Sequence, residues 1–542
     1  MSLPSKLRDR AFRWMADDPD PATRAELQQV AARAMGGDAA AVDDLADRMD
    51  GTLAFGTAGL RGQVRAGSNG MNRAVVLRAT YGVAEWLKHK GHGSGTVLVG
   101  RDARHGSVEF AAAAADVLAA AGFVVRTLPG PLPTPVTAFL VRSLGAVAGI
   151  QVTASHNPPA DNGYKVYTED GAQIVPPDDR LIEAGIRDAP AAVSVPVADA
   201  AVPIADVSDY VTRVASLPRG AARDLRVVLT PMHGVGGETA LAALNAAGFT
   251  DVRLVEAQAE PDPDFPTVAF PNPEEPGAAD LLLALATEVD ADLAIALDPD
   301  ADRCALGVRF ADGWRMLRGD ETGVLLGSHV LSTVDRVAHP DPLVASTIVS
   351  SSLLSLVAAA HGARHVETLT GFKWLMRAGD GLVFAYEEAL GLSVDPDFVR
   401  DKDGISAAVL ACDLAATLKA AGRTLVDALD DLAVAHGVHL TDQVSLRFDD
   451  VSAMPRLVAG LRANPPSTLG GVAVTQDGPA PDILRLRAEG LRVVIRPSGT
   501  EPKVKAYLEI VEPVPGSLDD ARTKATARLA TLRDEVTTLL QG

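Results

Sequence analysis

The feature that most constrains the fold of this chain is an alternation of short β-branched runs with helical stretches, which occurs three times in succession. The first series spans residues 96–152, the second 225–297 and the third 344–386. Alternation of this kind predicts βαβ units, whose strands lie parallel in one sheet. The sequence therefore predicts an α/β protein in which three similar units follow one another.

Each series can be divided into individual elements. We expect strands at 96–99, 124–127, 146–152, 225–229, 252–255, 293–297, 344–348, 364–367 and 382–386. We expect helices at 108–121, 134–141, 238–247, 278–289, 353–360 and 372–377. No identity between the three series is strong enough to prove an internal repeat.

The segments before, between and after these units have patterns of their own. Residues 1–50 place Ala, Leu and Val three and four positions apart, which predicts short amphipathic helices. The Ala/Pro-rich stretch 189–203 has no periodicity, so we expect it to link domains. After Val438 strands and helices occur in mixed order, with strands at 491–496 and 504–510 and a helix from Leu518. The expected division is a helical extension at 1–50, α/β domains at 51–205, 206–315 and 316–438, and an α+β domain at 439–542.

Length and charge restrict the class of protein. At 542 residues the chain exceeds one core, and about 100–200 residues per domain predict roughly three to five domains. The net charge of −20 disfavours nucleic acid and anionic membranes as partners, because both bind a basic face. An anionic ligand must therefore meet a local cluster of Arg and Lys.

The cysteines and the N-terminus bear on the cellular compartment. Cys304 and Cys412 are too few for a disulfide framework, which favours a reducing compartment. The first residues, MSLPSKLRDRAF, lack the apolar core of a signal peptide. No apolar run approaches the roughly 18–20 residues that span a bilayer. We therefore expect a soluble, cytoplasmic protein.

The first candidate loop contains a serine. In an open parallel sheet, ligands bind beyond the carboxyl ends of the strands, and Thr153-Ala-Ser-His-Asn-Pro-Pro159 follows such a strand. A lone Ser-His-Asn is more often an ordinary turn. Gly-x-Ser-x-Gly is absent, and in an extended loop His156 would point away from Ser155, so a nucleophile elbow is disfavoured. What remains is a serine that accepts and donates a phosphoryl group beside a metal and cationic side chains.

The second loop, Asp298-Pro-Asp-Ala-Asp302, carries three carboxylates at alternate positions after strand 293–297. They can converge as hard oxygen ligands, and Mg²⁺ fits because it leaves places for phosphate oxygen. A solvated acidic turn would look similar, although three Asp after a buried strand would repel one another without a cation. An EF-hand is excluded, since Arg303 and Arg309 replace its Gly and Glu. A phosphatase with Asp298 as nucleophile stays open as a second interpretation.

Two further loops have polar side chains that suit a sugar phosphate. Arg496-Pro-Ser-Gly-Thr-Glu-Pro502 combines one Arg, two hydroxyls and a glycine, which is typical of a phosphate cradle. Tyr386-Glu-Glu-Ala-Leu-Gly391 offers paired carboxylates that can accept hydrogen bonds from vicinal sugar hydroxyls. A plain turn and an exposed acidic turn, respectively, would give the same patterns.

In this order and with these spacings, the four loops resemble those of the α-D-phosphohexomutase superfamily, from about residue 50 to the end of the chain. The resemblance is closest to the phosphoglucomutase-2-like branch, through Phe55-Gly-Thr-Ala-Gly-Leu-Arg-Gly62, Gly371-Phe-Lys-Trp374 and Glu-Glu-Ala-Leu-Gly. It implies three similar α/β domains with mixed or parallel sheets and a C-terminal α+β domain around a central cleft. It also implies a mutase that works through phosphoserine and a sugar 1,6-bisphosphate, which serves as activator.

The resemblance also implies roles for individual residues. Ser155 is the phosphoserine, and its phosphate oxygen would bind Mg²⁺ together with Asp298, Asp300 and Asp302. The reacting phosphoryl group would be lined by Arg61, His156 and Arg303. The general acid/base or sugar-contacting lysines would be Lys165 and Lys402. The sugar would contact Gly371, Lys373, Glu387 and Glu388. The non-reacting phosphate would be held by Arg496, Ser498, Gly499 and Thr500.

One residue departs from the hexose-directed pattern. Many such members have serine where this chain has Ala389, and the alanine also occurs in members that favour pentose phosphates. We expect glucose phosphate as substrate, with mannose and pentose phosphates as alternatives. The phosphatase and a non-catalytic sugar-phosphate binding protein are the remoter hypotheses.

Overall fold

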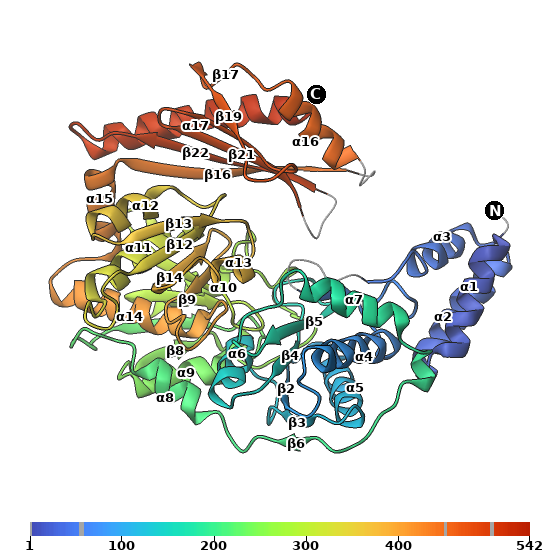
Figure 1. Cartoon of the computed structure of the whole chain (residues 1–542). Helices are drawn as coiled ribbons and strands as arrows, with labels where there is room; N and C mark the ends of the chain where they lie inside the picture. The colour runs from blue at the N-terminus through green and yellow to red at the C-terminus, as the bar shows by residue number, and fades with distance from the viewer. Residues whose placement is uncertain (1–2, 54–58, 449–452, 499–502, 542) are drawn as a thin grey trace. The chain divides into compact units, whose positions relative to one another are not determined.

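The computed structural model describes residues 3–53, 59–448, 453–498 and 503–541. Its elements are labelled in Figure 1 and gather into two compact units. The first unit comprises Met1–Met316 and Gly391–Thr417, and the second comprises Leu317–Leu390 and Leu418–Gly542.

The first sheet of the first unit has a parallel centre. Its strands are β1 Leu60–Gln63, β2 Thr96–Arg101, β3 Val124–Thr127, β4 Ala148–Val152, β5 Asp161–Thr168 and β6 Val202–Pro203. They lie in the order β1-β5-β4-β2-β3-β6, with β2 parallel to both β3 and β4. Strand β5 runs antiparallel to β4, and β1 runs antiparallel to β5. The helices are α4 Arg73–His89, α5 Ser107–Ala120, α6 Thr134–Ser143 and α7 Asp178–Asp188.

The second sheet repeats this plan. Its strands are β7 Arg226–Thr230, β8 Asp251–Leu254, β9 Leu293–Leu297, β10 Cys304–Phe310 and β11 Gly313–Met316. They lie in the order β11-β10-β9-β7-β8, and β7 is parallel to both β8 and β9. Strand β10 runs antiparallel to β9 and to β11. The helices are α8 Ser208–Ala215, α9 Gly236–Ala246, the 3₁₀ turn η2 Glu256–Gln258 and α10 Asp280–Glu288. All five residues of β9, the central strand of this sheet, are buried.

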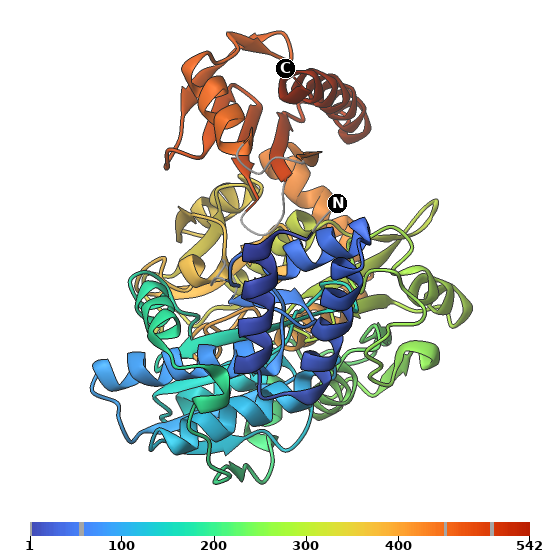
Figure 2. The ribbon, with the colours of Figure 1, turned by 90° about the vertical axis from the view of Figure 1, so that its right-hand side faces the viewer.

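Three helices at the N-terminus, α1 Ser5–Asp17, α2 Pro21–Met35 and α3 Ala39–Arg48, share an apolar core of their own. Asp20 and Asp38 cap α2 and α3, because their carboxylates accept hydrogen bonds from backbone N–H groups in the first turn. Figure 2 turns these helices, coloured blue, toward the viewer. Each helix therefore buries one apolar face against the other two.

The first unit also contains a segment from much later in the chain. It includes β15 Gly391–Ser393 and most of α14 Gly404–Ala420. Gly391 forms an isolated β-bridge with Arg303, which ties this segment to the start of β10. Helix α14 is buried over most of its surface, as its almost continuous apolar sequence requires.

The second unit begins with a third sheet, in which three strands run parallel. Strand β12 Leu343–Thr347 lies between β13 Arg364–Thr368 and β14 Leu382–Glu387, parallel to both. The accompanying helices are α11 Gly319–Thr333, α12 Leu353–Ala360 and α13 Phe372–Leu375. Helix α11 contacts β14, and α12 contacts β13.

The C-terminal part of the second unit is an antiparallel sheet covered by helices. Its strands are β16 Val438–Arg447, β19 Thr475–Asp477, β20 Leu484–Ala488, β21 Leu491–Pro497 and β22 Lys503–Glu512, in the order β16-β22-β21-β20-β19. A short pair, β17 Thr468–Leu469 and β18 Val472–Ala473, stands apart. The helices are α15 Leu425–His436, α16 Ala453–Ala463 and α17 Leu518–Gln541. Figure 1 shows α17 lying along β16 and β22, which it contacts.

The expected fold class, with mixed or parallel sheets, is confirmed. The βαβ series are present, and each of the first two sheets adds antiparallel strands that the sequence pattern did not predict. The stretch 189–203 is more than a linker, since β6 pairs with β3 at the sheet edge. Ala192 and Val195 are buried in the core of the first sheet. A two-residue strand is too short to produce a periodic pattern, which explains the error.

Within the described ranges, no single helix has the length and apolar composition needed to cross a membrane. One consecutive pair, α14 and α15, meets that criterion only when both helices are counted together.

Candidate active site

The serine loop begins where β4 ends, so Ser155 lies beyond the carboxyl end of a buried strand. Ser155 has a φ of 53°, a left-handed conformation that is uncommon for residues other than glycine. Its backbone N–H donates to Thr153 Oγ1 at 2.9 Å. The loop is therefore a turn and not extended, and the expectation that His156 points away is wrong. His156 Nδ1 lies 3.2 Å from Ser155 Oγ.

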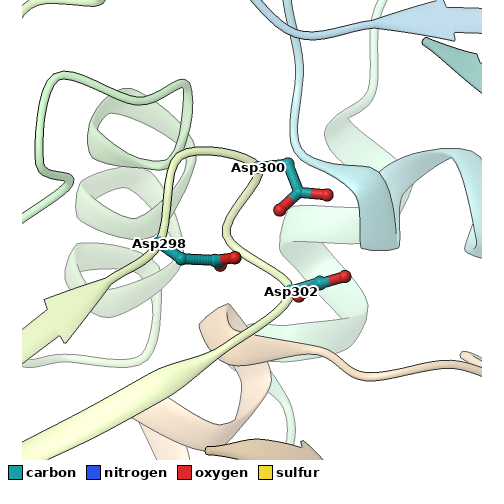
Figure 3. Close-up of side chains that lie close together, drawn as sticks. All are labelled: Asp298, Asp300 and Asp302. Carbon is teal, nitrogen blue, oxygen red and sulfur yellow. The ribbon is translucent and has the colours of Figure 1, made fainter. Parts of the chain in front are cut away.

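The aspartate loop follows β9 and meets the serine loop. Asp298, Asp300 and Asp302 are fully buried, and Figure 3 shows their side chains projecting from the single loop between β9 and β10. One carboxylate oxygen from each lies within 4.8 Å of the other two. Ser155 Oγ donates a hydrogen bond of 2.7 Å to Asp298 Oδ2. The structure thus brings together two loops whose hydrogen-bonded residues stand 143 positions apart in the chain.

Two lysines offset the charge of the aspartates. Lys165, on β5, is buried and places Nζ 2.8 Å from Asp300 Oδ2 and from Asp302 Oδ2. Lys402 Nζ lies 3.2 Å from Asp302 Oδ2. A buried carboxylate needs such partners, because its ionised form loses its hydration on burial. Both predicted lysines therefore belong to the site.

These contacts set the charge state of each aspartate. Burial opposes ionisation of Asp302, but the charges of Lys165 and Lys402 outweigh it and hold the pKa well below its ordinary value. Burial and the charge of Asp302 oppose ionisation of Asp300, yet Lys165 lowers its pKa as well. Burial and the two negative neighbours raise the pKa of Asp298 well above its ordinary value. The loop therefore holds two stable anions beside a third that needs further positive charge.

The donor set suits a divalent cation. Asp300 Oδ1 and Asp302 Oδ1 are buried and accept no hydrogen bond from any described residue. Buried carboxylate oxygens are usually satisfied, so two such acceptors fit a ligand that the protein binds there. Carboxylate oxygens are hard ligands of the kind that Mg²⁺ and Ca²⁺ take. The three aspartates can therefore hold a metal ion.

Lys402 stands between two aspartates that fix its loop. Asp401 accepts a hydrogen bond of 2.8 Å from Tyr167 OH. Asp403 accepts one of 2.8 Å from Tyr210 OH. Both carboxylates and both tyrosines are buried, so the loop is anchored on each side of the lysine. The core of the unit therefore fixes the residues on both sides of Lys402.

The other residues predicted to line the reacting group surround the same two loops. The backbone N–H of Arg303 donates to Asp298 Oδ1 at 3.0 Å. Arg61, on β1, donates from Nη1 to Asn157 Oδ1 at 3.2 Å. Burial lowers the pKa of His156 well below its ordinary value, and the positive charges of Arg303 and Arg61 act in the same direction. The His156 ring is therefore neutral.

The acidic loop after β14 belongs to the second unit. Glu387 Oε1 accepts the backbone N–H of Gly371 at 2.7 Å. Glu388 Oε2 accepts hydrogen bonds from Thr347 Oγ1 at 3.1 Å and Ser350 Oγ at 2.9 Å. Burial raises the pKa of Glu388 to about 7, and the charge of Glu387 adds to this shift. The printed partners of these two carboxylates are hydroxyl and backbone groups, whereas Asp300 and Asp302 also contact lysines.

The expected phosphate cradle lies on the turn after β21. Arg496 is near the end of that strand, and the Ser498 N–H donates to Lys503 O at 2.7 Å. That hydrogen bond joins the two strands on either side of the turn. Gly499 and Thr500 lie outside the described residues.

One side chain relates the acidic loop to the cradle. Burial and the charge of Glu388 raise the pKa of Tyr507, whereas Arg496 acts in the opposite direction. Tyr507 therefore lies near both predicted groups, although nothing in the sequence indicated it.

The remaining predicted sugar contact is Lys373, on α13, whose Nζ lies 5.8 Å from the centroid of the Trp374 ring.

Two residues of the site were missed in the sequence. Thr134 Oγ1 donates to Asp300 Oδ2 at 2.6 Å, and its N–H donates to Asp300 O at 2.9 Å. Arg104 donates to carbonyl oxygens of the serine loop, including that of Ser155 at 2.7 Å. Arg104 follows the end of β2 by three residues, so selecting loops after strands would have found it.

An α/β fold that gathers a serine, an acidic loop that can hold a metal ion and buried lysines is typical of a phosphoryl-transfer enzyme. Three family models described as phosphoglucomutase/phosphomannomutase, alpha/beta/alpha domains I, II and III, match residues 52–192, 208–310 and 318–434. The chain therefore belongs to the phosphoglucomutase/phosphomannomutase family, and the resemblance to the α-D-phosphohexomutase superfamily is confirmed. Its reaction is the isomerase-type transfer of a phosphoryl group within a sugar phosphate.

Individual relatives agree with this class but differ in the sugar they are named for. A probable phosphomannomutase of Haemophilus influenzae is 43% identical over 456 residues, which cover 81% of this chain and 93% of the relative. A phosphopentomutase of Homo sapiens is 35% identical, with 87% of each chain covered. Other relatives are named phosphoribomutase and phosphoglucomutase. A putative phosphomannomutase from Thermus thermophilus shares the fold, with a TM-score of 0.70, 24% identity and coverage of 90% of this chain and 99% of that structure.

Proposed function

We propose that this mutase interconverts glucose 1-phosphate and glucose 6-phosphate through phosphorylated Ser155, with Mg²⁺ and with glucose 1,6-bisphosphate as intermediate and activator. The observation that carries the proposal is the 2.7 Å hydrogen bond from Ser155 Oγ to Asp298 Oδ2. It places a hydroxyl nucleophile directly against the group of carboxylates that suits a metal ion.

Ser155 is the proposed carrier of the phosphoryl group. Its hydroxyl donates to Asp298 Oδ2, and Nδ1 of the neutral His156 ring lies 3.2 Å from Ser155 Oγ. Phosphoryl transfer needs little covalent work from the protein beyond alignment and neutralisation of charge. A serine held between these two groups meets the first requirement.

The second requirement falls to the cations of the site. Asp298, Asp300 and Asp302 would hold Mg²⁺ together with an oxygen of the Ser155 phosphate. When bound, Mg²⁺ supplies positive charge that offsets the charge on the transferred group. Arg61, His156 and Arg303 are the proposed side chains around that group.

The remaining predicted residues are proposed to bind the sugar and its second phosphate. Lys165 and Lys402 are buried cations that can exchange a proton with a sugar hydroxyl. The proposed sugar contacts are Gly371, Lys373, Glu387 and Glu388. The proposed ligands of the non-reacting phosphate are Arg496, Ser498, Gly499 and Thr500. After the first transfer the bisphosphate must turn round, so that its other phosphate returns to Ser155.

Pentose phosphate is the second candidate substrate. Ala389 stands where many hexose-directed members have serine, and relatives of this chain are named phosphopentomutase. A missing hydroxyl contact lowers discrimination for a hexose, because the substrate hydroxyl then loses a partner.

We also propose a cytoplasmic location and the division into domains at 51–205, 206–315, 316–438 and 439–542. The two cysteines, both free and buried, are consistent with a reducing compartment.

The alternative with Asp298 as nucleophile is disfavoured by its contacts. Asp298 Oδ1 accepts the Arg303 N–H, and Oδ2 accepts the Ser155 hydroxyl. An attacking carboxylate must be ionised, but burial and two negative neighbours raise the pKa of Asp298 well above its ordinary value. Ser155 is therefore the preferred nucleophile.

A Ser155→Ala variant tests the proposal. We expect it to lose interconversion of glucose 1-phosphate and glucose 6-phosphate, measured with Mg²⁺ and a trace of glucose 1,6-bisphosphate. Thr137→Val is a matched control, because Thr137 also donates a short buried hydrogen bond, to Gln151 Oε1 at 2.6 Å. Mannose, ribose and deoxyribose 1-phosphates, each with its bisphosphate, complete the assay. Activity in Ser155→Ala with release of inorganic phosphate would instead support the phosphatase.

A further inference from the structure

Arg104 binds the serine loop through the backbone. Its Nη2 donates to the carbonyl oxygens of Ser155 at 2.7 Å and Asn157 at 2.6 Å. Its Nη1 donates to the carbonyl oxygens of Pro158 at 2.8 Å and Asp161 at 3.1 Å. One buried guanidinium thus holds four carbonyl groups of the segment 155–161, which contains the proposed nucleophile and the turn that follows it.

Arg104 is itself held in place. Asp102 Oδ1 accepts the Arg104 backbone N–H at 3.0 Å and the Ser107 hydroxyl at 2.6 Å. Asp102 Oδ2 lies 3.5 Å from Arg104 Nε, and the guanidinium carbon lies 4.9 Å from the centroid of the Phe265 ring. A planar guanidinium fixed in this way presents its donors in one rigid geometry.

The conformation of Ser155 explains why such a fixed donor is needed. A left-handed backbone is disfavoured at a residue with a Cβ, so the contacts around Ser155 must hold it there. Thr153 Oγ1 accepts the N–H of Ser155, and Arg104 binds its carbonyl oxygen. These two contacts fix the peptide groups on both sides of the nucleophile. Its Oγ is thereby directed at Asp298 Oδ2.

We infer that Arg104 is a positioning residue for phosphoryl transfer: it locks the serine loop in the strained turn that aims Ser155 Oγ at the aspartates. Its Nη1 and Nη2 groups have four N–H bonds, and the four carbonyl oxygens take all of them. Arg104 therefore acts through the loop and not by contact with the phosphoryl group. The inference rests on the proposed role of Ser155.

Arg223 is a matched control in the same unit. It donates to the carbonyl oxygens of Gly220 at 2.8 Å and Ala247 at 2.7 Å. Its Nη1 lies 3.7 Å from Asp413 Oδ1, and its guanidinium carbon lies 5.0 Å from the centroid of the Phe249 ring. Arg223 thus makes the same kinds of contact as Arg104, but with segments that contain no predicted site residue.

The test compares Arg104→Met, Arg104→Lys and Arg223→Met in the full-length enzyme with Mg²⁺. The measurements are kcat and KM for glucose 1-phosphate, the rate at which labelled glucose 1,6-bisphosphate phosphorylates the enzyme, and the melting temperature. We expect Arg104→Met to lower kcat and the phosphorylation rate about 100-fold, because a small displacement of a nucleophile has an effect of that order. KM should change less than about threefold, since the loss is confined to the transition state.

Arg223→Met should leave kcat and KM within about threefold of the parent enzyme. We expect this even if the melting temperature of Arg223→Met falls by as much as that of Arg104→Met. Arg104→Lys replaces Arg104→Met if that variant does not fold. It should also lose kcat, because an ammonium group has only three N–H bonds for four carbonyl oxygens. The inference is wrong if the Arg104 variants keep kcat within threefold of Arg223→Met, or if only KM changes.

Ser155→Ala in the same assays separates this inference from the proposed function. If Ser155→Ala is active, Ser155 is not the nucleophile, and both the proposed function and the role of Arg104 are wrong. An inactive Ser155→Ala enzyme beside a fully active Arg104→Met enzyme would overturn the role of Arg104 alone.

Discussion

Carboxylates lie at the predicted sites of both units, buried in the first and half-buried in the second, and their partners differ. In the first unit, Lys165 lies 2.8 Å from both Asp300 and Asp302, and their pKa values are lowered. In the second unit, the partners of Glu388 include the hydroxyls of Thr347 and Ser350, and burial raises its pKa to about 7. Permanent anions suit a metal ion and a phosphoryl group, whereas a carboxyl that is close to neutral suits the hydroxyls of a sugar.

A second carboxylate of the same unit shows that the neighbouring group, and not the unit, decides whether the pKa is raised or lowered. Glu509 is buried more deeply than Glu388, yet Arg492 Nη2 lies 2.8 Å from its Oε2, and the hydroxyl of Ser351 donates to Oε1 at 2.7 Å. Burial opposes ionisation, but these contacts and His439 outweigh it and lower the pKa of Glu509 to about 2. A nearby cation therefore reverses the effect of burial.

The largest expected effect comes from removing the cation of the first site. Lys165→Met leaves Asp300 and Asp302 buried without their nearest positive charge, which should destabilise the fold by ~3–5 kcal/mol. Loss of Lys165 as the proposed proton-transfer group should also lower kcat by about 10²–10⁴-fold. Thermal unfolding and the mutase assay measure the two effects. Lys90→Met, at the exposed Lys90–Glu169 pair, is the control and should change neither by much.

The same substitution in the second unit should affect stability without a proton-transfer effect. Arg492→Met leaves Glu509 buried without its arginine, so the fold should lose ~3–5 kcal/mol, seen as a lower melting temperature. Adding Glu509→Gln should recover more than half of the loss, because the buried charge is removed. Arg533→Met, at the more exposed pair with Asp442, is the control. If the double variant is no more stable than Arg492→Met, the comparison between the two units fails.

A pH series sharpens the contrast at Glu388. Its folded pKa, about 7, lies above its ordinary value, so the stability of the neutral form is fully present at low pH and is lost as the pH rises through 7. Glu388→Gln removes this dependence. Between pH 5 and pH 8 the variant should therefore gain up to ~3 kcal/mol relative to the parent. Melting temperatures measured across this range test the expectation, and parallel curves for the two proteins would contradict it.

The smallest effect is expected at an ion pair on the surface, whose N···O distance is similar to those of Lys165 with Asp300 and Asp302. Arg309 Nη1 lies 2.7 Å from Asp290 Oδ1, but the two side chains are 62% and 81% exposed. Arg309→Ala should cost less than ~1 kcal/mol, because water already solvates both charges. A thermal shift as large as that of Lys165→Met would show that distance, and not burial, controls these pairs.

Much of the fold could be predicted because central parallel strands are buried on both faces and read as apolar runs. The predicted bounds agree to the residue for β3, β9 and α12. Strand β5 was missed because its sequence, DNGYKVYT, mixes polar and apolar residues. It carries Lys165, whose buried charge is explained only by the aspartates that face it. A strand that carries polar residues of the site therefore lacks the continuous apolar run by which a buried strand is predicted.

The sequence by itself determined which chemical groups each loop offers, since Ser155 and His156 are adjacent and the three aspartates fall within five consecutive positions. Only the tertiary structure decided how those groups are paired. Lys165 and Asp300 are 135 positions apart, and Arg104 and Ser155 are 51 apart. Such contacts depend on the order of strands in the sheet and on a left-handed turn at one serine. Neither property is encoded in the local pattern of residues, because both arise from packing between distant segments.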